Sequence, residues 1–346
     1  MEEELLVIVL AVDMQNGMTH LSIKAPAAAD PNDEEKGYLS LEASGRSFSD
    51  AIALLHAATP RRLNFSQVRE IIVGEQAVQD DECTGLLRQI SLLPRIRGAA
   101  NVIICRGSAM DFAAQVKPYL GLRLSRYTDD TLADSAGKGF TPNTTLAEGL
   151  RDLGSGLKDP LFILGAVNDF SADAPENSSS LKVSAGQLPR KSTDPIDLFG
   201  AAVTDGAAMT GALTGDEMAL LHLLTGSGHF YIAQLPEMTV TLYARTPAEL
   251  SVALSTRPIR LRIRLLCDVR LSPGEKPDKA ALTEQITRQI SALIAKLQAL
   301  NSDALGFGLR AVRQFATIGA WEQLRFKALY RQAQTNVQLT LRYIAN

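Results

Sequence analysis

The segment between residues 259 and 300 constrains the fold more than any other part of this chain of 346 residues. Its first part alternates apolar residues with arginines, which is the period of a strand buried on one face. The apolar positions are Ile259, Leu261, Ile263 and Leu265, and the arginines are Arg260, Arg262 and Arg264. At Leu265-Leu266-Cys267 the alternation slips, which predicts a β-bulge at that point.

A long amphipathic helix is predicted after this strand, between Asp278 and Leu300. Its apolar residues recur every three or four positions and form one stripe, at Leu282, Ile286, Ile290, Leu293, Ile294 and Leu297. The end of the chain alternates again, with one apolar face formed by Val337, Leu339, Leu341 and Tyr343. A one-sided sheet and a helix with one apolar stripe can bury each other, so we expect an antiparallel sheet with a long covering helix in this region.

The first 170 residues alternate short apolar runs with helical patterns, which is typical of an α/β domain. The expected strands are Leu5–Val12, Thr19–Ala25, Ile71–Gly74, Val102–Cys105 and Leu161–Gly165. Asn16-Gly17 has the composition of a hairpin turn between the first two strands. Ser47 and Ser108 have side chains that can cap the first turn of the helices that follow them.

Residues 169–194 are rich in Ser, Asp, Pro and Asn and mark the clearest boundary in the chain. Beyond them, Asp205-Gly206 predicts a second hairpin, and a helix is expected to begin at Thr214 or Gly215. We therefore predict an α/β (α+β) protein with three domains built around mixed or antiparallel sheets covered by helices. The predicted parts are an N-terminal domain (1–170), a linker or edge excursion (171–196), a small hairpin and helix domain (197–235) and a C-terminal domain (236–346).

Composition excludes several classes of function. The formal net charge is -3, so the chain has no positive field that would attract nucleic acid as its main ligand. Aromatic residues make up 5%, too few to suggest a platform for stacking bases or sugars. The three cysteines, Cys83, Cys105 and Cys267, are too far apart for a disulfide framework or a Cys-x-x-Cys metal site, and we expect them to be small buried hydrophobes. No run approaches the roughly 20 apolar residues that a membrane helix needs.

The histidines show no metal-binding spacing; they are His20, His56, His222 and His229. Gly137-Lys138-Gly139 lacks the following Ser or Thr of a phosphate loop, so we interpret it as a turn. Arg106-Gly107-Ser108-Ala109 is explained by helix capping. Asp129-Asp130 and Asp80-Asp81-Glu82 are assigned to loops or first helical turns, where negative charge favours the helix N-terminus. We predict a protein that is not an enzyme, with no catalytic, cofactor or metal residues and with its binding residues unknown.

The arginine row at Arg260, Arg262 and Arg264 allows two interpretations. It could bind an anion or an acidic partner, or it could be a solvated sheet face whose charges discourage aggregation. The sequence favours the solvated face.

Several segments, in order and with matching spacing, carry a resemblance that covers nearly the whole chain. They are Gly45–Phe48, Pro60–Phe65, Ile72–Glu75, Arg106–Ala109, Phe199–Val203, Gly211–Glu217 and, after the long helix, Leu300–Gly308 with Trp321, Ala333 and Asn336-Val337. Together they resemble the Ger(x)C family, the C subunits of spore germinant receptors. Within them, Asp303 can cap the turn after the helix, and Gly306 and Gly308 allow a positive φ or a close backbone approach.

The resemblance implies three α/β domains and a non-enzymatic subunit required for nutrient-triggered spore germination, acting with the membrane-embedded A and B subunits of the receptor. It also implies a lipoprotein anchored at the outer face of the spore inner membrane. The first cysteine is Cys83, so we expect the signal peptide and the lipidated cysteine to lie upstream of Met1. The family's Arg-Asp-Pro segment is replaced by Leu93-Pro94-Arg95-Ile96-Arg97.

The rival hypothesis is an extracytoplasmic small-molecule binding protein or enzyme, with a ligand between its domains. A single tight ligand among amino acids and sugars would favour this hypothesis over the receptor subunit.

Overall fold

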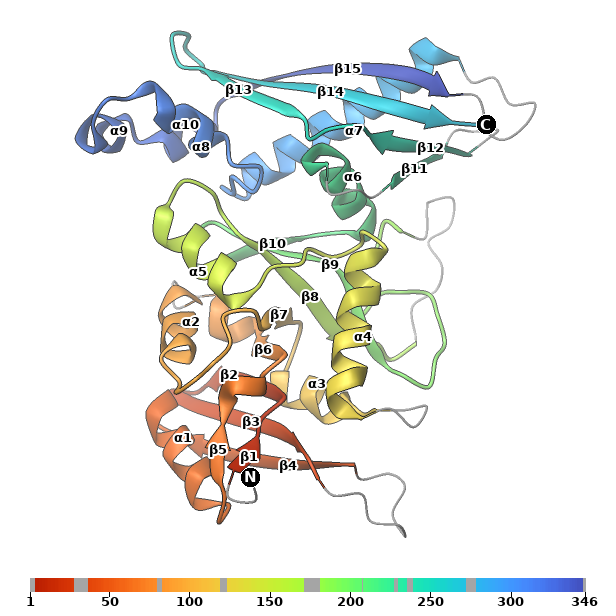
Figure 1. The fold of residues 1–346 in the computed structure, drawn as a ribbon. Coiled ribbons are helices and arrows are strands. Elements are labelled where there is room, and N and C mark those ends of the chain that lie inside the picture. The colour runs from red at the N-terminus through yellow and green to blue at the C-terminus, as the bar shows by residue number, and fades with distance from the viewer. Residues whose placement is uncertain are drawn as a thin grey trace.

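The computed structural model describes residues 4–27, 37–79, 83–118, 123–170, 181–206, 208–226, 230–234, 239–271 and 278–344. Within these ranges the strands form three sheets, of two, eight and five strands, and helices cover the larger two (Figure 1). The predicted mixed α/β class is confirmed.

The N-terminal half builds most of the eight-stranded sheet. Its elements are β1 (Glu4–Leu6), β2 (Val9–Gln15), β3 (Met18–Pro26), β4 (Tyr38–Gly45), α1 (Phe48–Ala57), β5 (Arg62–Asn64), η1 (Phe65–Gln67), β6 (Glu70–Gly74), η2 (Glu75–Val78), α2 (Cys83–Ser91), β7 (Asn101–Cys105), α3 (Ala109–Gln115), α4 (Leu124–Gly137), α5 (Leu146–Ser155) and β8 (Leu161–Val167). The strand order is β10-β9-β8-β7-β6-β2-β3-β4, with a parallel centre of β2, β6, β7 and β8. β1 and β5 form the separate parallel pair.

Helices cover both faces of this sheet and make it the middle of three layers. Leu55 of α1, Leu87 of α2 and Leu146 of α5 belong to the core on one face. Phe112 of α3 and Tyr127 of α4 belong to the core on the other face. In Figure 1 the first group lies to the left of the sheet and the second to the right.

The predicted local signals for this half are confirmed. β2 and β3 pair as an antiparallel hairpin, and Asn16 and Gly17 both take positive φ at its turn. The Ser47 hydroxyl accepts a hydrogen bond from Asp50 N at 3.1 Å and begins α1. The Ser108 hydroxyl accepts one from Asp111 N at 3.2 Å and begins α3.

The rest of the chain extends that sheet and then builds the five-stranded one. Its elements are β9 (Ile196–Thr204), β10 (Met209–Leu213), α6 (Gly215–Thr225), β11 (Phe230–Gln234), β12 (Thr239–Ala244), β13 (Glu249–Ala253), β14 (Arg260–Arg270), α7 (Lys279–Ala299), α8 (Phe307–Ala311), η3 (Val312–Gln314), α9 (Ile318–Leu324), α10 (Phe326–Tyr330) and β15 (Gln334–Ile344). All six predicted apolar residues of the long helix are buried in the core that α7 shares with β14 and α6. Helix α6 lies between the two large sheets, and α7 runs behind the five-stranded sheet in this view (Figure 1).

The pairing of the last strand corrects one expectation. We predict an antiparallel C-terminal sheet, but β15 pairs parallel to β14 over its whole length, from Arg260 and Gln334 to Arg270 and Ile344. Because α7 lies between the two strands in sequence, it is a crossover helix that returns the chain to the same end of the sheet. The five-stranded sheet is therefore mixed.

The predicted bulge in β14 is also wrong. The register with β15 is unbroken, and the burial alternates without a slip, with Leu266 37% exposed between buried Leu265 and Cys267. Leu265 and Leu266 are both apolar, so the alternation of apolar and polar residues is interrupted in the sequence although the strand is regular and simply exposes Leu266. An isolated exposed leucine is common on protein surfaces.

Strands β9 and β10 fall in the predicted middle domain (197–235), and their pairing shows which sheet this segment joins. The hairpin at Asp205-Gly206 is confirmed, and β9 continues the eight-stranded sheet by pairing with β8. The described part of the predicted linker, 181–196, packs on this sheet, with Ser184 and Ala185 buried. The domain boundaries at 170, 196 and 235 therefore stay a prediction.

A buried ionic cluster joins the two halves of the molecule. Asp159, which precedes β8, and Asp303, which follows α7, are each 2% exposed. Asp303 N donates to Asp159 Oδ2 at 2.7 Å, and Lys327 Nζ of α10 binds Asp159 Oδ1 at 2.7 Å. Lys327 also donates to the carbonyl of Asp205 in the β9–β10 turn. Segments from four places in the sequence thus meet at one pair of carboxylates.

Asp303 organises the chain reversal after α7, as the sequence predicts. Its carboxylate accepts hydrogen bonds from the backbone N–H groups of Gly306, Phe307 and Gly308 at 3.1, 2.9 and 2.6 Å. Gly306 takes φ +77°, and a Cβ on Gly308 would lie 2.5 Å from the carbonyl oxygen of Leu157. Both glycines are therefore required by geometry.

Replacing Lys327 tests this junction. Lys327→Met leaves the buried Asp159 carboxylate without its cation, and we expect a loss of about 2–4 kcal/mol in unfolding free energy, reduced because a third of Lys327 is exposed. Burial already raises the pKa of Asp159 against the opposing effect of Lys327. Without Lys327 that pKa rises further, so folding takes up a proton, and the stability of the variant falls as the pH rises from the unfolded pKa through the folded one. Urea unfolding should therefore show a smaller deficit at low pH than at neutral pH.

The matched control is Lys138→Met, which removes an exposed i,i+4 pair with Asp134 and should cost about 0.3–0.5 kcal/mol. Equal losses in the two variants, or a deficit for Lys327→Met that does not change with pH, would contradict the role given to Lys327.

Candidate functional site

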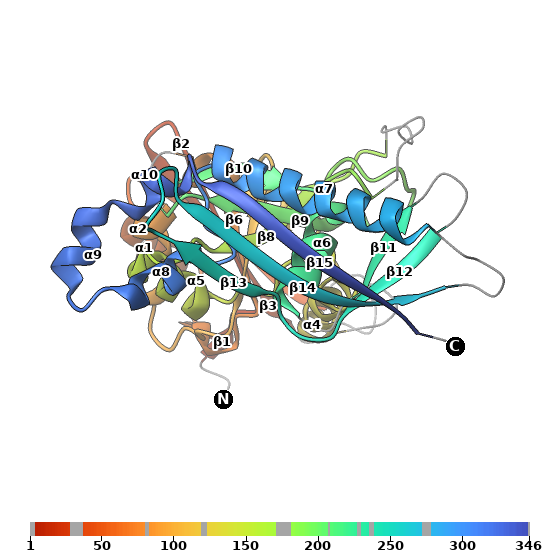
Figure 2. The same ribbon diagram turned by 90° about the horizontal axis from the view of Figure 1, so that it is seen from above.

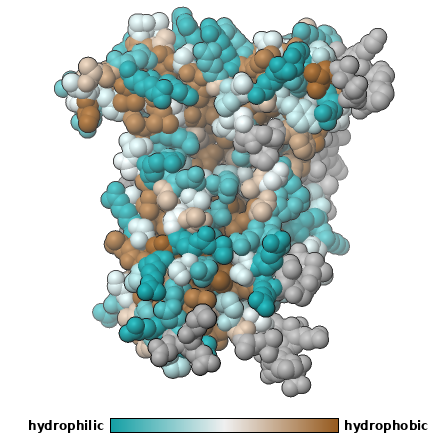
Figure 3. All heavy atoms as spheres, viewed as in Figure 1, coloured by the Kyte–Doolittle hydropathy of each residue, from teal (hydrophilic) through white to brown (hydrophobic). Residues whose placement is uncertain are grey.

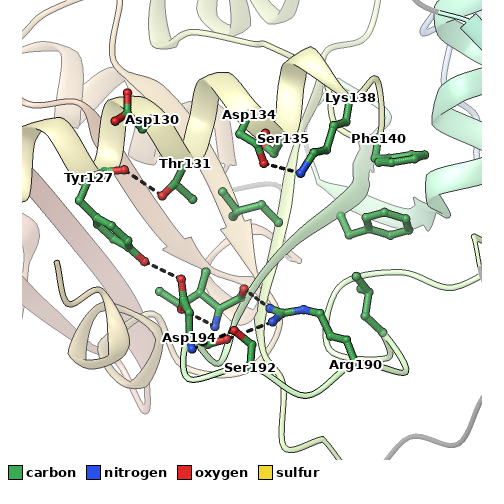
Figure 4. A pocket seen from close by; sticks show the side chains of 14 residues that line it. Tyr127, Asp130, Thr131, Asp134, Ser135, Lys138, Phe140, Arg190, Ser192 and Asp194 are labelled. Carbon is green, nitrogen blue, oxygen red and sulfur yellow. Dashed lines mark hydrogen bonds and ion pairs between the residues drawn. The ribbon is translucent and has the colours of Figure 1, made fainter. Parts of the chain in front are cut away.

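A cavity of about 520 Å³ lies against one face of α4 (Figure 4). Its first wall consists of α4 residues spaced three and four apart, which places them on one helix face: Tyr127, Asp130, Thr131, Asp134, Ser135 and Lys138. Its second wall is Phe140 and alternating residues of the segment 188–199, namely Leu188, Arg190, Ser192, Asp194, Ile196, Leu198 and Phe199. The cavity is therefore a groove between a helix and a returning loop.

An ionic brace fixes the second wall. Arg190 Nη2 and Nε bind Asp197 Oδ1 at 2.7 and 3.0 Å, and Nη2 also donates to the Ile196 carbonyl at 2.6 Å. The Asp197 side chain is fully buried and also accepts from Asn168 Nδ2 and Gly186 N. Because the Arg190 guanidinium is committed to these acceptors, it braces the loop and is not held ready for a ligand.

A hydrogen bond closes the groove at the other end. Tyr127 Oη donates to Asp194 Oδ2 at 2.8 Å, and Asp194 Oδ1 accepts from Ile196 N at 3.0 Å. Figure 4 shows Tyr127 on α4 pointing at Asp194 across the groove. The two walls are thus tied together by a tyrosine and a carboxylate.

A β-bulge in β9 turns Phe199 into the cavity wall. Phe199 and Gly200 lie opposite the single residue Leu164 of β8, and Gly200 takes φ +85°. A Cβ on Gly200 would lie 2.2 Å from the Leu213 carbonyl oxygen, so only glycine fits there. The Phe199 ring then packs against Phe140 with centroids 4.9 Å apart.

A buried pair of ionisable groups lies on the same side of the sheet as this groove. Glu70 begins β6 and is 3% exposed, and burial raises its pKa to about 8 against the opposing charge of Lys24. Burial also lowers the pKa of Lys24 to about 8. Lys24 Nζ donates to the Val116 carbonyl at 2.6 Å and lies 4.5 Å from the centre of the Tyr38 ring. These contacts commit Lys24 to holding the loop after α3 against β3.

The arrangement contains no convergent set of free catalytic groups among the side chains that the structure describes. In the groove, Asp130 pairs with Arg126 at 2.8 Å and Asp134 pairs with Lys138 at 2.6 Å. No group of three or more His, Cys, Asp or Glu side chains suited to a metal lies in the described ranges. The groove offers hydroxyl groups and three aromatic rings, of Tyr127, Phe140 and Phe199, which suits binding better than catalysis.

The charged and histidine residues that were considered as site candidates from the sequence lie apart from one another in the structure. Asp129 and Asp130 lie inside α4, which corrects their assignment to a loop or first turn. Lys138 caps the end of that helix and lines the groove. Asp80-Asp81-Glu82 and His229 lie outside the described residues.

The remaining candidates have structural roles. Ser108 Oγ and the N–H groups of Ala109 and Met110 donate to the buried Asp13 carboxylate at 2.8, 2.9 and 3.1 Å, so Arg106-Gly107-Ser108-Ala109 is part of a helix cap. His20 Nδ1 pairs with Ser44 Oγ at 2.7 Å and His222 Nε2 with the Thr141 carbonyl at 2.9 Å. The three cysteines are buried as predicted, and burial raises the pKa of each thiol to about 12.

Exposed apolar side chains are scattered over the surface. The most exposed are Leu92 after α2 and Ile318 in α9, at 81% and 76%. Figure 3 shows the face of Figure 1 as small apolar areas broken up by hydrophilic ones. None of the described helices is both long and apolar enough to span a membrane.

Two family comparisons cover most of the chain. The sequence model of the spore germination protein N-terminal domain matches residues 1–164, and that of the spore germination B3/GerAC-like C-terminal region matches residues 199–344. The chain belongs to the Ger(x)C family of spore germination proteins. The resemblance stated from the sequence motifs is confirmed.

One solved structure has a similar fold over nearly the same length. It is titled "Crystal Structure of the GerBC protein" and covers 97% of both chains at 13% identity, with a TM-score of 0.51. No match was found among curated proteins. The two family matches leave residues 165–198 between them, so most of the second wall of the groove comes from outside both matched ranges.

Proposed function

We propose that this protein is the non-enzymatic C subunit of a spore germinant receptor, required for nutrient-triggered germination. The observation that carries the proposal is that both family models match, in order, over residues 1–164 and 199–344. A supporting feature is that the buried carboxylates of Asp13, Asp197 and Asp303 hold helix caps, a loop and a turn. In this role the protein acts with the membrane-embedded A and B subunits and is held at the outer face of the spore inner membrane by an N-terminal lipid.

Deleting the gene tests this function. We expect spores of the deletion strain to lose their response to at least one nutrient, measured as the fall in absorbance after nutrient addition, and to regain it when the gene is restored. Purification of a tagged copy from solubilised spore membranes should also recover two multi-spanning membrane proteins. An unchanged response to every nutrient, together with no membrane protein in the purified fraction, would refute the proposed role.

The groove of about 520 Å³ between α4 and residues 188–199 supports a second candidate function, the binding of a small polar molecule. The residues that line it combine hydroxyl groups with aromatic rings, as do many pockets for small molecules.

Thermal shift with a panel of amino acids and sugars tests the second candidate. A specific ligand at about 100 times its Kd should stabilise the protein by roughly 2.7 kcal/mol and raise its Tm. Thr131→Trp, which fills the groove, should abolish the shift, whereas Ala133→Trp on the exposed side of α4 should preserve it. A panel without any shift, or equal shifts in both variants, would remove this candidate and leave the receptor role untouched.

A further inference from the structure

The outward face of the five-stranded sheet carries an uncovered row of arginines. Along β14 the side chains of Arg260, Arg262, Arg264 and Leu266 are exposed, and the residues between them are buried against the core. Figure 2 looks onto this sheet, with β13, β14 and β15 lying in front of the elements beneath them. The alternation predicted from the sequence therefore leaves one face of the strand open to solvent.

Two of these arginines are not neutralised by the protein. Arg264 binds Gln338 Oε1 at 3.0 Å and lies 3.5 Å from Glu249. Within the described ranges, Arg260 and Arg262 have neither an ion pair nor a side-chain hydrogen bond. Their neighbours in register are uncharged, Ala253 and Gln334 for Arg260 and Ser251 and Asn336 for Arg262.

At the other end of β14, by contrast, the exposed charges are paired. There Asp268 is held between Arg245 and Arg342, with nitrogen to oxygen distances of 2.9 and 2.8 Å. A face stabilised by cross-strand ion pairs would place carboxylates beside Arg260 and Arg262 as well. Uncharged neighbours leave both guanidinium groups available to another molecule.

The arginines share a shallow depression with carboxamide side chains. Its volume is about 380 Å³, and Gln334, Asn336 and Gln338 of β15 line it beside the three arginines. Guanidinium groups bind carboxylates in a bidentate manner, and carboxamides can both donate to and accept from a peptide backbone. The depression therefore presents the groups that recognise an acidic polypeptide.

We propose that this face binds an extended acidic segment of a partner protein, lying along β14. Alternate side chains of an extended chain are spaced by roughly 6.6–6.8 Å, which is also the spacing of Arg260, Arg262 and Arg264 along the strand. Acidic residues at alternate positions would meet the arginines, and an apolar residue next in line would meet Leu266. Because β14 is already paired with β13 and β15 on its two edges at this end, the segment lies on the face and does not add a strand.

An anionic bilayer fits this face less well than a peptide. Glu249 and Asp268 lie on the same outward face as the arginines, in register with Arg264 and Arg342. A flat negative surface would have to approach these carboxylates, whereas a narrow segment confined to the depression avoids them. The proposal concerns a contact that the family assignment does not specify, and it is tested independently of germination.

Binding of a labelled peptide tests the proposal. The probe is a fluorescent peptide of alternating Glu and Ser, compared by anisotropy with the same peptide carrying Gln in place of Glu. We expect only the Glu peptide to bind, and we expect the double variant Arg260→Glu/Arg262→Glu to weaken it at least about tenfold. Raising the salt from about 50 mM to about 300 mM should weaken the wild-type complex, because exposed charges are screened.

The control is Arg46→Glu/Arg88→Glu, which makes the same change in net charge at exposed positions before α1 and in α2. This control variant should weaken the binding of the Glu peptide by less than about twofold. Equal weakening by both double variants, or equal binding of the Glu and Gln peptides, would overturn the proposal. A third result would also overturn it: the Glu peptide does not bind, but the protein sediments with phosphatidylglycerol vesicles and loses this binding in the Arg260→Glu/Arg262→Glu variant.

Discussion

Asp159 and Asp303 are carboxylates buried where the two large sheets meet, and the arrangement of the whole molecule depends on how they are satisfied. An unpaired buried carboxylate is costly, so each must find donors before the chain can pack around it. Asp303 finds them in its own turn, from Gly306, Phe307 and Gly308, and Asp159 finds them in Asp303 N and Lys327. The donors to Asp159 come from segments far from it in sequence, so satisfying this carboxylate fixes the C-terminal sheet on the N-terminal body.

The junction also explains why the two sheets share helices. α7 covers the five-stranded sheet, and its Lys296 binds Glu217 of α6 at 2.6 Å, while α6 in turn packs on β9 of the eight-stranded sheet. Thr210 of β10 donates to the Leu300 carbonyl at the end of α7 at 2.9 Å. The outer face of the five-stranded sheet, where the arginine row lies, is covered by none of the helices that the structure describes.

The elements that depend on interactions between residues close in sequence could be predicted from the sequence. The stripe of α7, the serine caps of α1 and α3 and the turn around Asp303 all follow from spacing and from short-range hydrogen bonds. The direction of β15 did not, because alternation shows which face of a strand is buried and is the same for parallel and antiparallel pairing. Leu266 misled the sequence analysis in a different way. An exposed apolar residue in a strand that is buried on one face gives the same sequence pattern as a β-bulge.

The groove was the part of the molecule least accessible to sequence reasoning. The pattern of α4 is weak, because the buried face of the helix includes Thr128 beside Leu124, Tyr127 and Leu132. The opposite wall is held by Arg190 and Asp197, a pair whose geometry depends on the return of the chain from a polar segment. A spacing of three and four among Tyr127, Thr131, Asp134 and Lys138 was the available signal for one helix face.

Native-state hydrogen exchange tests the central claim, that the buried carboxylates make the two sheets one cooperative unit. The N–H groups of Asp303, Phe307 and Gly308 donate into these carboxylates and should exchange only on global unfolding. Their opening free energies should equal those of amides in β8 and β14. A markedly lower opening free energy for β14 and for these three amides than for β8 would show that the C-terminal sheet unfolds alone, and would contradict the account.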